Sequence, residues 1–219
     1  MSTTPFQLIL LVEGPTDKHF YEALVRKISS TREAPFLTIG KIKICSCEGI
    51  NQIAQKGVSH IRRLKNMKQI NTKQVVVAAC YDTDRGNQQS QFDRSKFIEG
   101  IKGLDIAPGK IIFCAADRTI EDWILIDAKG VLDFLNLPSD TKIDGKTGKK
   151  KLERLYNKKG KTYIDRDDTA DLIARLDMGK ILNTLTGDAE TGIDKLKAVI
   201  LDGEGLKVEN TRRKKAVRK

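Results

Sequence analysis

Residues 7–24 read QLILLVEGPTDKHFYEAL, an apolar run followed by a charged turn and a helical pattern. The run at 7–12 is short, continuous and rich in β-forming residues, which predicts a strand buried on both faces of a parallel sheet. Gly14 and Pro15 end that strand, and Thr16 suits the N-cap of a helix. Residues 7–24 therefore predict a buried strand that leads through a tight charged turn into a helix.

The alternation of strand and helix continues along the chain. Phe20, Leu24 and Ile28 recur at helical spacing, which predicts an amphipathic helix that ends near Ser29. Further apolar runs predict strands at residues 41–47, 74–81 and 110–115, with helical patterns between them. This order is typical of an open α/β sheet, so we expect a mostly parallel four-stranded sheet flanked by helices.

The chain of 219 residues suits one domain with a small addition. We expect a catalytic α/β domain at 1–128 and a small C-terminal helical extension at 129–206, with a basic loop at 142–166 inside it. Residues 207–219 read as a basic flexible tail. Helical patterns in the extension lie at 130–135, 169–185 and 192–201, with a short one near 152–156.

Basic residues outnumber acidic ones, 40 Lys and Arg against 29 Asp and Glu, for a net charge of +11. Such a balance favours polyanionic partners, either nucleic acid or an anionic membrane surface. The excess is concentrated in residues 56–73, 142–166 and 207–219. The residues that we predict to contact nucleic acid are Arg62, Arg63, Lys65, Arg85, Lys149, Lys150 and Lys151. For Arg85, an ion pair with Asp82 or Asp84 is an equally good interpretation.

Several classes of protein are disfavoured. No apolar run approaches the ~18 residues of a membrane span, and residues 1–5 lack the positive charge of a signal peptide. The four cysteines lie in apolar runs without a CxxC pair, which indicates buried, reduced thiols. We expect a cytoplasmic protein that does not bind a membrane.

Acidic residues follow three of the predicted strands. Glu13 follows the first, Asp82 and Asp84 the third, and Asp117, Glu121 and Asp122 come after the fourth. Functional residues of parallel sheets gather at the carboxyl ends of the strands, where these carboxylates would repel one another without a cation. Oxygen ligands suit Mg²⁺ or Mn²⁺, although single Asp residues in such loops are also common as caps and turn formers.

Three segments carry a resemblance to a known family: LLVEGPTDKHFYEAL at 10–24, VVVAACYDTDRG at 75–86 and DRTIEDWILID at 117–127. Glu-Gly followed by Asp-x-Asp, each after an apolar strand, resembles the Toprim domain of topoisomerases, bacterial primases, OLD-type nucleases and the ribonuclease that matures 5S ribosomal RNA. The EGPTD form looks more like the stand-alone and OLD-type branch. The resemblance implies a Toprim-like (Rossmann-like) fold. The sequence has no Gly-rich P-loop, so the ATPase of OLD proteins is not expected in this chain.

The resemblance also implies roles for particular acids. Glu13 would be a metal ligand or general acid/base, Asp82 and Asp84 would bind metal, and Glu121 matches the third acidic position. Asp17 is a further candidate ligand, while Asp117 and Asp122 compete with Glu121. The implied cofactor is one or two Mg²⁺ or Mn²⁺ ions.

The leading hypothesis is a Mg²⁺-dependent Toprim-type nuclease that acts on DNA or RNA, as a defence effector beside a separate ATPase subunit. One alternative is an RNA-maturation ribonuclease like the 5S ribosomal RNA maturase. A second is a non-catalytic nucleic-acid-binding module with a structural metal, and a third is a response-regulator-like domain with Asp82 as phosphoacceptor.

Overall fold

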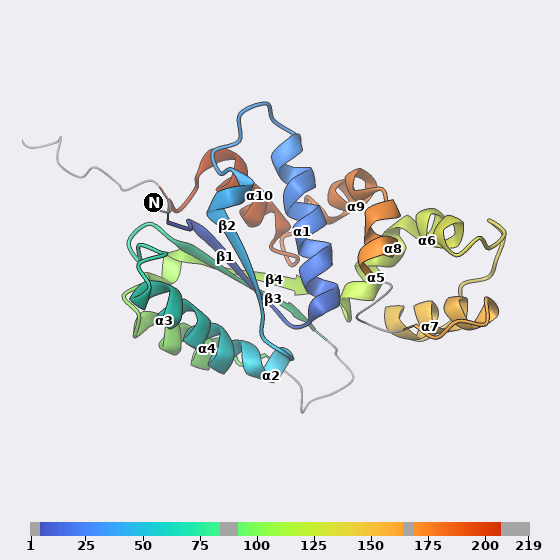
Figure 1. Cartoon of the computed structure of the whole chain (residues 1–219), viewed down its shortest axis with the longest axis horizontal. Coiled ribbons are helices and arrows are strands. Elements are labelled where there is room, and N and C mark those ends of the chain that lie inside the picture. Colours follow the sequence, from blue (N-terminus) through green and yellow to red (C-terminus); the bar gives the residue numbers. More distant parts are fainter. Residues whose placement is uncertain (1–4, 84–91, 164–168, 207–219) are drawn as a thin grey trace, which may run out of the picture.

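The computed structural model describes residues 5–83, 92–163 and 169–206. The sequence-predicted site residues Asp84 and Arg85, the end of the basic loop at 164–166 and the basic tail at 207–219 lie outside these ranges. The structure is an α/β sheet flanked by helices (Figure 1). No helix in the described ranges combines the length and apolar character needed to cross a bilayer.

The sheet has four strands: β1 (Leu8–Val12), β2 (Ile42–Ser46), β3 (Val76–Asp82) and β4 (Ile111–Ala116). Their order is β2-β1-β3-β4, and every pair is parallel (Figure 1). All of β1 is buried, as its unbroken apolar run predicts for a central parallel strand. The predicted four-stranded parallel sheet flanked by helices is therefore confirmed.

Two hydrophobic layers form because successive side chains of a strand point to opposite faces. Leu8, Leu10 and Val12 pack with α1 (Pro15–Ser30) in one buried cluster. Ile9 and Leu11 pack with the other cluster, which includes α3 (Val58–Asn66) and α4 (Arg94–Lys102). The sheet is thus covered on both faces, and only its strand ends and edges are open to function.

The segment after β2 differs from a single regular helix. It comprises α2 (Ile50–Gln52), a π-helical turn at Ile53–Gly57 and then α3. A β-carbon at Gly57 would lie 2.7 Å from the Leu11 side chain. The helix therefore approaches the sheet more closely at Gly57 than a larger residue would allow.

The C-terminal part of the chain is helical. It contains α5 (Ile120–Ile124), α6 (Ala128–Phe134), α7 (Gly148–Lys158), α8 (Thr169–Arg175), α9 (Met178–Leu185) and α10 (Ile193–Asp202). The prediction of one helix over 169–185 is wrong. Asp177 breaks it, because its carboxylate accepts hydrogen bonds from the backbone N–H groups of Gly179 and Lys180 and so starts a new helix.

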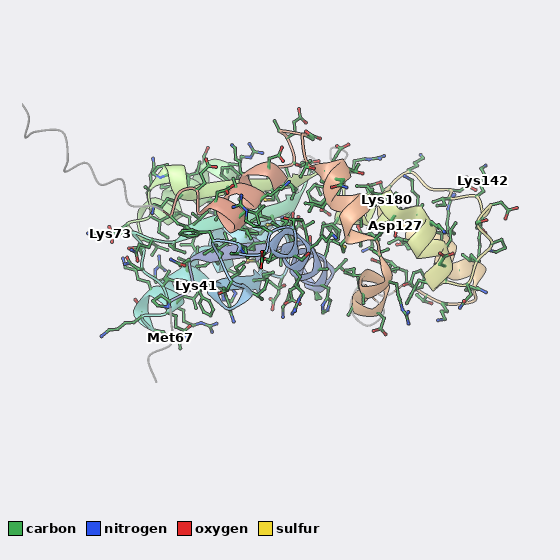
Figure 2. All side chains as sticks on the ribbon, turned by 90° about the horizontal axis from the view of Figure 1, so that it is seen from above. Lys41, Met67, Lys73, Asp127, Lys142 and Lys180 are labelled. Carbon is green, nitrogen blue, oxygen red and sulfur yellow. The ribbon has the colours of Figure 1, made fainter. Side chains whose placement is uncertain are left out.

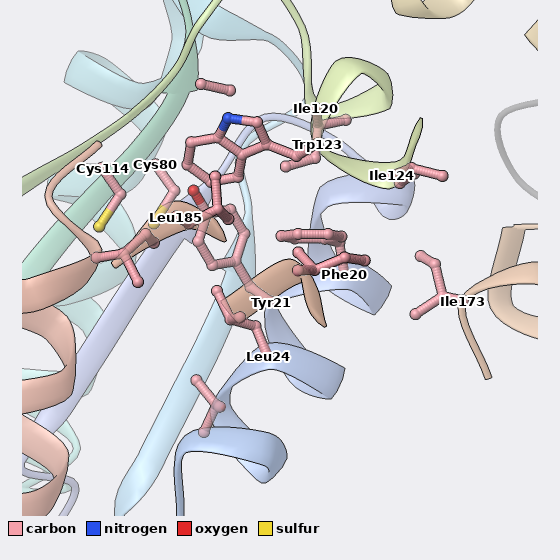
Figure 3. Close-up of a cluster of buried hydrophobic side chains, with 14 of the residues drawn as sticks. Phe20, Tyr21, Leu24, Cys80, Cys114, Ile120, Trp123, Ile124, Ile173 and Leu185 are labelled. Atoms are coloured by element: carbon pink, nitrogen blue, oxygen red, sulfur yellow. The ribbon is translucent and has the colours of Figure 1, made fainter. Parts of the chain in front are cut away.

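Of these helices, α5, α8, α9 and α10 pack against α1, whereas α6 contacts α8 and α7 contacts α5 to the side of the sheet (Figure 1). Phe20 and Tyr21 of α1 contact Trp123 of α5, with ring centroids 6.0 and 6.4 Å apart (Figure 3). The buried Asp127 accepts a hydrogen bond of 2.9 Å from the Asp177 backbone N–H and lies 3.5 Å from the Lys180 ammonium (Figure 2). These contacts tie α8 and α9 to the segment that follows α5.

The cysteines behave largely as their apolar surroundings predict. All four are free; Cys47, Cys80 and Cys114 are buried, whereas Cys45 on the edge strand is only partly buried. Burial raises the pKa of the Cys47 thiol to about 12, so it stays protonated and unreactive.

Candidate functional site

A cavity of about 650 Å³ lies where β1, β2 and β3 end. Its walls come from the β1–α1 turn, the β2–α2 turn, the end of β3, the start of α5 and the start of α7. The lining residues are Glu13, Gly14, Pro15, Thr16, Asp17, Ser46, Glu48, Gly49, Asp82, Thr119, Ile120, Glu121 and Lys149. The structure thus brings four of the sequence-predicted acids together in one hollow.

Glu13 links the ends of three strands. Its carboxylate Oε1 accepts a hydrogen bond of 2.7 Å from the backbone N–H of Asp82 at the end of β3. Its backbone carbonyl accepts another, of 2.9 Å, from the Gly49 N–H after β2. The bond between Glu13 and Asp82 is possible because β1 and β3 are adjacent and parallel, so their ends lie close together.

Asp17 lies in the first turn of α1 and is only 7% exposed. Its Oδ2 accepts a hydrogen bond of 3.1 Å from the Gly14 N–H, so it helps to fix the start of the helix. Burial raises the pKa of the Asp17 carboxyl to about 8, and the negative charge of Glu13 adds to the rise. Asp17 therefore has both a capping role and a share in a crowded acidic cluster.

Asp82 is the most perturbed of these acids. Its Oδ1 atom is buried and has no hydrogen-bond partner among the described residues. Burial raises the pKa of Asp82 to about 10, and the charges of Asp17, Glu13 and Glu121 raise it further. A buried carboxylate oxygen without a donor is costly, and a nearby cation would remove that cost.

Three acids are candidates for the third acidic position, and the structure places them in two different cavities. Glu121 is 6% exposed and lines the carboxylate cavity. Asp122 is turned to a neighbouring cavity, where it lies 3.4 Å from the Arg118 guanidinium and 3.5 Å from the Lys151 ammonium. Asp117 lines that neighbouring cavity as well. Of the three, Glu121 is the one that faces the other predicted acids.

The start of α7 places a lysine in the wall of the cavity. A β-carbon at Gly148 would lie 2.3 Å from the Asp122 backbone nitrogen, so α7 begins in close contact with α5. Lys149, the next residue, lines the carboxylate cavity. Lys150 instead pairs with Glu153 at 2.6 Å, and Lys151 pairs with Asp122. Of these three predicted contacts, Lys149 is the one that lines the carboxylate cavity.

The predicted basic residues on α3 lie elsewhere. Arg62 and Arg63 are exposed on α3 and do not line the cavity. Lys65 pairs with Asp105 at 2.9 Å, shortly before β4 begins. Because this end of α3 lies by the amino ends of the strands, the fold does not bring these residues to the carboxylates. They stay predictions as nucleic-acid contacts.

Ser46 and Glu48 are among the lining residues that were not recognised as site candidates in the sequence. Ser46 ends β2, and its hydroxyl lies 3.5 Å from the backbone carbonyl of Glu13. Glu48 follows it with a positive φ of 62° and pairs with Lys56. The sequence feature that could have identified them is the Glu48-Gly49 pair after β2, which has the same residues as the Glu13-Gly14 pair after β1.

The donors in the cavity suit a hard divalent cation in kind, because they are carboxylate oxygens without His or Cys. The orphaned Asp82 Oδ1 supports the same ion. Within the described ranges, however, no three His, Cys, Asp or Glu side chains are already arranged to hold a metal.

Comparisons with known proteins give structural similarities alone. No protein-family model matches the chain, and no curated protein matches it. The C-terminal region of the Burkholderia pseudomallei OLD protein is similar at 15% identity and a TM-score of 0.37, covering 87% of this chain and 88% of that one. The C-terminal region of the Xanthomonas campestris pv. campestris OLD protein is similar at 16% identity and a TM-score of 0.37, covering 90% and 93%. TM-scores this low carry no argument about function.

Proposed function

We propose that the chain is a Mg²⁺- or Mn²⁺-dependent nuclease of Toprim type, which hydrolyses phosphodiester bonds in DNA or RNA. The observation that carries the proposal is the buried, partnerless Oδ1 of Asp82 beside Glu13, Asp17 and Glu121. The large majority of buried side-chain polar atoms have a hydrogen-bond partner, so a carboxylate oxygen kept without a donor calls for an explanation. A cluster kept without one is typical of a site built for a cation.

Glu13, Asp82 and Glu121 would hold the ion, with Asp17 as a further ligand. Asp84 is proposed as a further ligand from its position in the sequence alone. A bound Mg²⁺ or Mn²⁺ ion supplies Lewis-acid polarisation of a phosphodiester and lowers the pKa of water.

The chain's own residues support two further roles. Lys149 brings a positive charge to the cavity, where it can bind a non-bridging phosphate oxygen and stabilise the charge that develops on it. The hydrogen bond from the Asp82 backbone keeps Glu13 oriented, so that its carboxylate needs little reorganisation during the reaction.

The proposal is tested by incubating the protein with Mg²⁺ and end-labelled DNA and RNA, single-stranded and duplex. Glu13→Gln and Asp82→Asn are compared with Asp122→Asn, a neighbouring acid already paired with Arg118 and Lys151. We expect cleavage by the wild type and by Asp122→Asn and none by the other two. Equal cleavage by all four proteins, or none by the wild type on every substrate, contradicts the proposal.

The substrate that is cleaved distinguishes the biological settings. Preference for a structured ribosomal RNA precursor would favour RNA maturation. Cleavage of DNA that needs a co-expressed ATPase would favour the defence role, which we propose on the resemblance in the sequence. Salt-sensitive binding without cleavage under any metal would favour a binding module.

A further inference from the structure

A second hollow, of about 270 Å³, lies between α1 and the edge strand β2. We call it the α1–β2 groove. Its lining residues are Lys18, Glu22, Val25, Arg26, Ile39, Ile42, Lys43 and Ile44. β2 has β1 as its one partner in the described sheet, so its outer edge borders the groove.

The α1–β2 groove lies beside the carboxylate cavity. On α1, Asp17 lines the cavity and the next residue, Lys18, lines the groove. On β2, Ser46 lines the cavity and Ile44 lines the groove. Nine residue steps along the helix from Asp17 to Arg26 span about 13 Å at ~1.5 Å each, and four strand steps from Ile42 to Ser46 span about the same length at ~3.3 Å each. The two walls therefore run side by side for about the length of four nucleotides at a duplex rise of ~3.4 Å.

The charge of the groove is positive. Lys18, Arg26 and Lys43 line it against the single acid Glu22, which lies 3.9 Å from Lys18 in a half-exposed pair that contributes little. Arg26 and Lys43 are exposed and have no carboxylate partner among the described residues. Lys43 alternates with Ile42 and Ile44 along β2, so its side chain leaves the opposite face of the strand, where its ammonium lies over the ring of Phe6, 5.7 Å from the ring centroid.

The positive field extends around the edge of the sheet. Burial raises the pKa of the Cys45 thiol, and the charges of Lys43, Arg63 and Lys18 oppose that rise. Lysines on an edge strand also discourage pairing with another sheet. That protective role needs only residues on β2, whereas Lys18 and Arg26 face the groove from α1.

We propose that the α1–β2 groove binds the phosphate backbone of a nucleic-acid strand and leads it to the carboxylate cavity. The inference rests on the proposed nuclease function and names the path of its substrate. Lys18 and Arg26 contact phosphates from α1, Lys43 contacts one from the outer edge of β2, and the partly exposed Ile42 and Ile44 pack against the sugars. An anionic lipid or an acidic peptide would be attracted by the same charges, but neither needs a groove that lies beside a phosphodiesterase cavity.

The test uses the full chain with two charge-matched double variants. Arg26→Glu/Lys43→Glu changes the groove, and Lys102→Glu/Lys129→Glu changes two exposed lysines on α4 and α6, away from it. Binding of a labelled 20-nucleotide single strand is measured in EDTA by fluorescence anisotropy over a series of salt concentrations. Cleavage is then measured with Mg²⁺, and thermal melts check that each variant folds.

We expect the groove variant to bind roughly 10–100-fold more weakly and its slope of log affinity against log salt to fall by about 1.4, for two lost phosphate contacts. Its KM should rise with little change in kcat, because Arg26 and Lys43 do not line the cavity. The control variant should lose less than about threefold in affinity.

Acetylation footprinting provides an independent readout. Bound oligonucleotide should protect Lys18 and Lys43 but not Lys102 or Lys129. If the wild type cleaves and the two double variants show equal binding, cleavage and protection, the groove proposal is overturned and the nuclease proposal still stands. If the oligonucleotide protects Lys18 and Lys43 and the groove variant has a reduced salt slope, but the wild type cleaves nothing, the groove proposal is supported and the nuclease proposal is contradicted. Binding to phosphatidylserine vesicles or poly-glutamate, but not to the oligonucleotide, overturns the groove.

Discussion

The carboxylate of Glu13 accepts a hydrogen bond of 2.7 Å from the backbone N–H of Asp82, so the acidic residue after β1 is anchored to the end of β3. The bond is possible because β1 and β3 are adjacent and parallel. It places two acids that are far apart in sequence in one cavity, where the buried Asp82 side chain keeps one oxygen without a donor. The predictions below test what this cluster does.

Glu121 and Asp122 are neighbours in sequence with different surroundings, which makes them a matched pair. Glu121→Gln should lower kcat/KM for cleavage by about 10²-fold or more, the usual loss when a charged active-site group is removed. Asp122→Asn should change it by only a few fold, because that carboxylate pairs with Arg118 and Lys151. Steady-state kinetics with one oligonucleotide checks both. A larger loss in Asp122→Asn would assign the third acidic position to the wrong residue.

Lys149 and Lys150 offer a second matched pair. Lys149→Ala should reduce the single-turnover cleavage rate about tenfold to a hundredfold, because Lys149 lines the carboxylate cavity, where phosphate charge would develop. Lys150→Ala removes the same charge from the same turn of α7, but that lysine pairs with Glu153, so its rate should stay close to wild type. Equal effects of the two substitutions would mean that only the overall charge matters.

The metal-free protein should lose stability as the pH rises. The pKa values of Asp17 and Asp82 are raised to about 8 and about 10, so the folded state binds protons more tightly than the unfolded chain. Their stabilising contribution is complete below the ordinary carboxyl pKa of ~3.9 and is lost as the pH rises through the two raised values. Thermal melts in EDTA from pH 5 to 9 measure the loss, which Asp82→Asn should reduce.

Added Mg²⁺ should reverse this trend. A cation favours the ionised carboxylates, so the rise in Tm on adding Mg²⁺ should be larger at pH 8 than at pH 5. The Asp82→Asn variant provides the control, since it should gain less than the wild type at both pH values. A rise in Tm that is the same in the variant and independent of pH would point to non-specific ion effects.

Gly148 is predicted to control the position of α7. Gly148→Ala would place a β-carbon 2.3 Å from the Asp122 nitrogen, which forces α7 away from α5. We expect a loss of about 1–3 kcal/mol in unfolding free energy, the usual cost of overpacking, and a loss of cleavage as Lys149 moves. Gly109→Ala is the control, because its β-carbon would meet no atom within 4 Å. Urea denaturation and cleavage assays check both variants.

The sheet and the ends of its strands were predictable because they depend on local pattern. Continuous apolar runs identified β1 and β3 as buried, and Glu13 and Asp82 follow from where those runs stop. The choice between Glu121 and Asp122 was not predictable, since it depends on the rotation of α5 about its axis. That rotation is set by the packing of Trp123 against Phe20 and Tyr21.

The basic part of the site was harder to predict, because it depends on tertiary contacts. Lys149 reaches the cavity through the contact of Gly148 with α5, and no periodicity in the sequence encodes that contact. The α1–β2 groove was missed because its cations come singly from α1 and β2 and form no run of charge. Conversely, Arg62 and Arg63 belong to a clear basic run, yet α3 carries them away from the carboxylates.

The most direct test of the central claim is a titration of the protein with Mn²⁺, followed by electron paramagnetic resonance, which counts bound ions without any substrate. We predict one or two bound Mn²⁺ ions per chain in the wild type, their displacement by excess Mg²⁺, and a strong loss of binding in Asp82→Asn with binding kept in Asp122→Asn. Wild-type protein that binds no Mn²⁺ at millimolar concentrations, or an Asp82→Asn variant that binds it as tightly, would contradict the account.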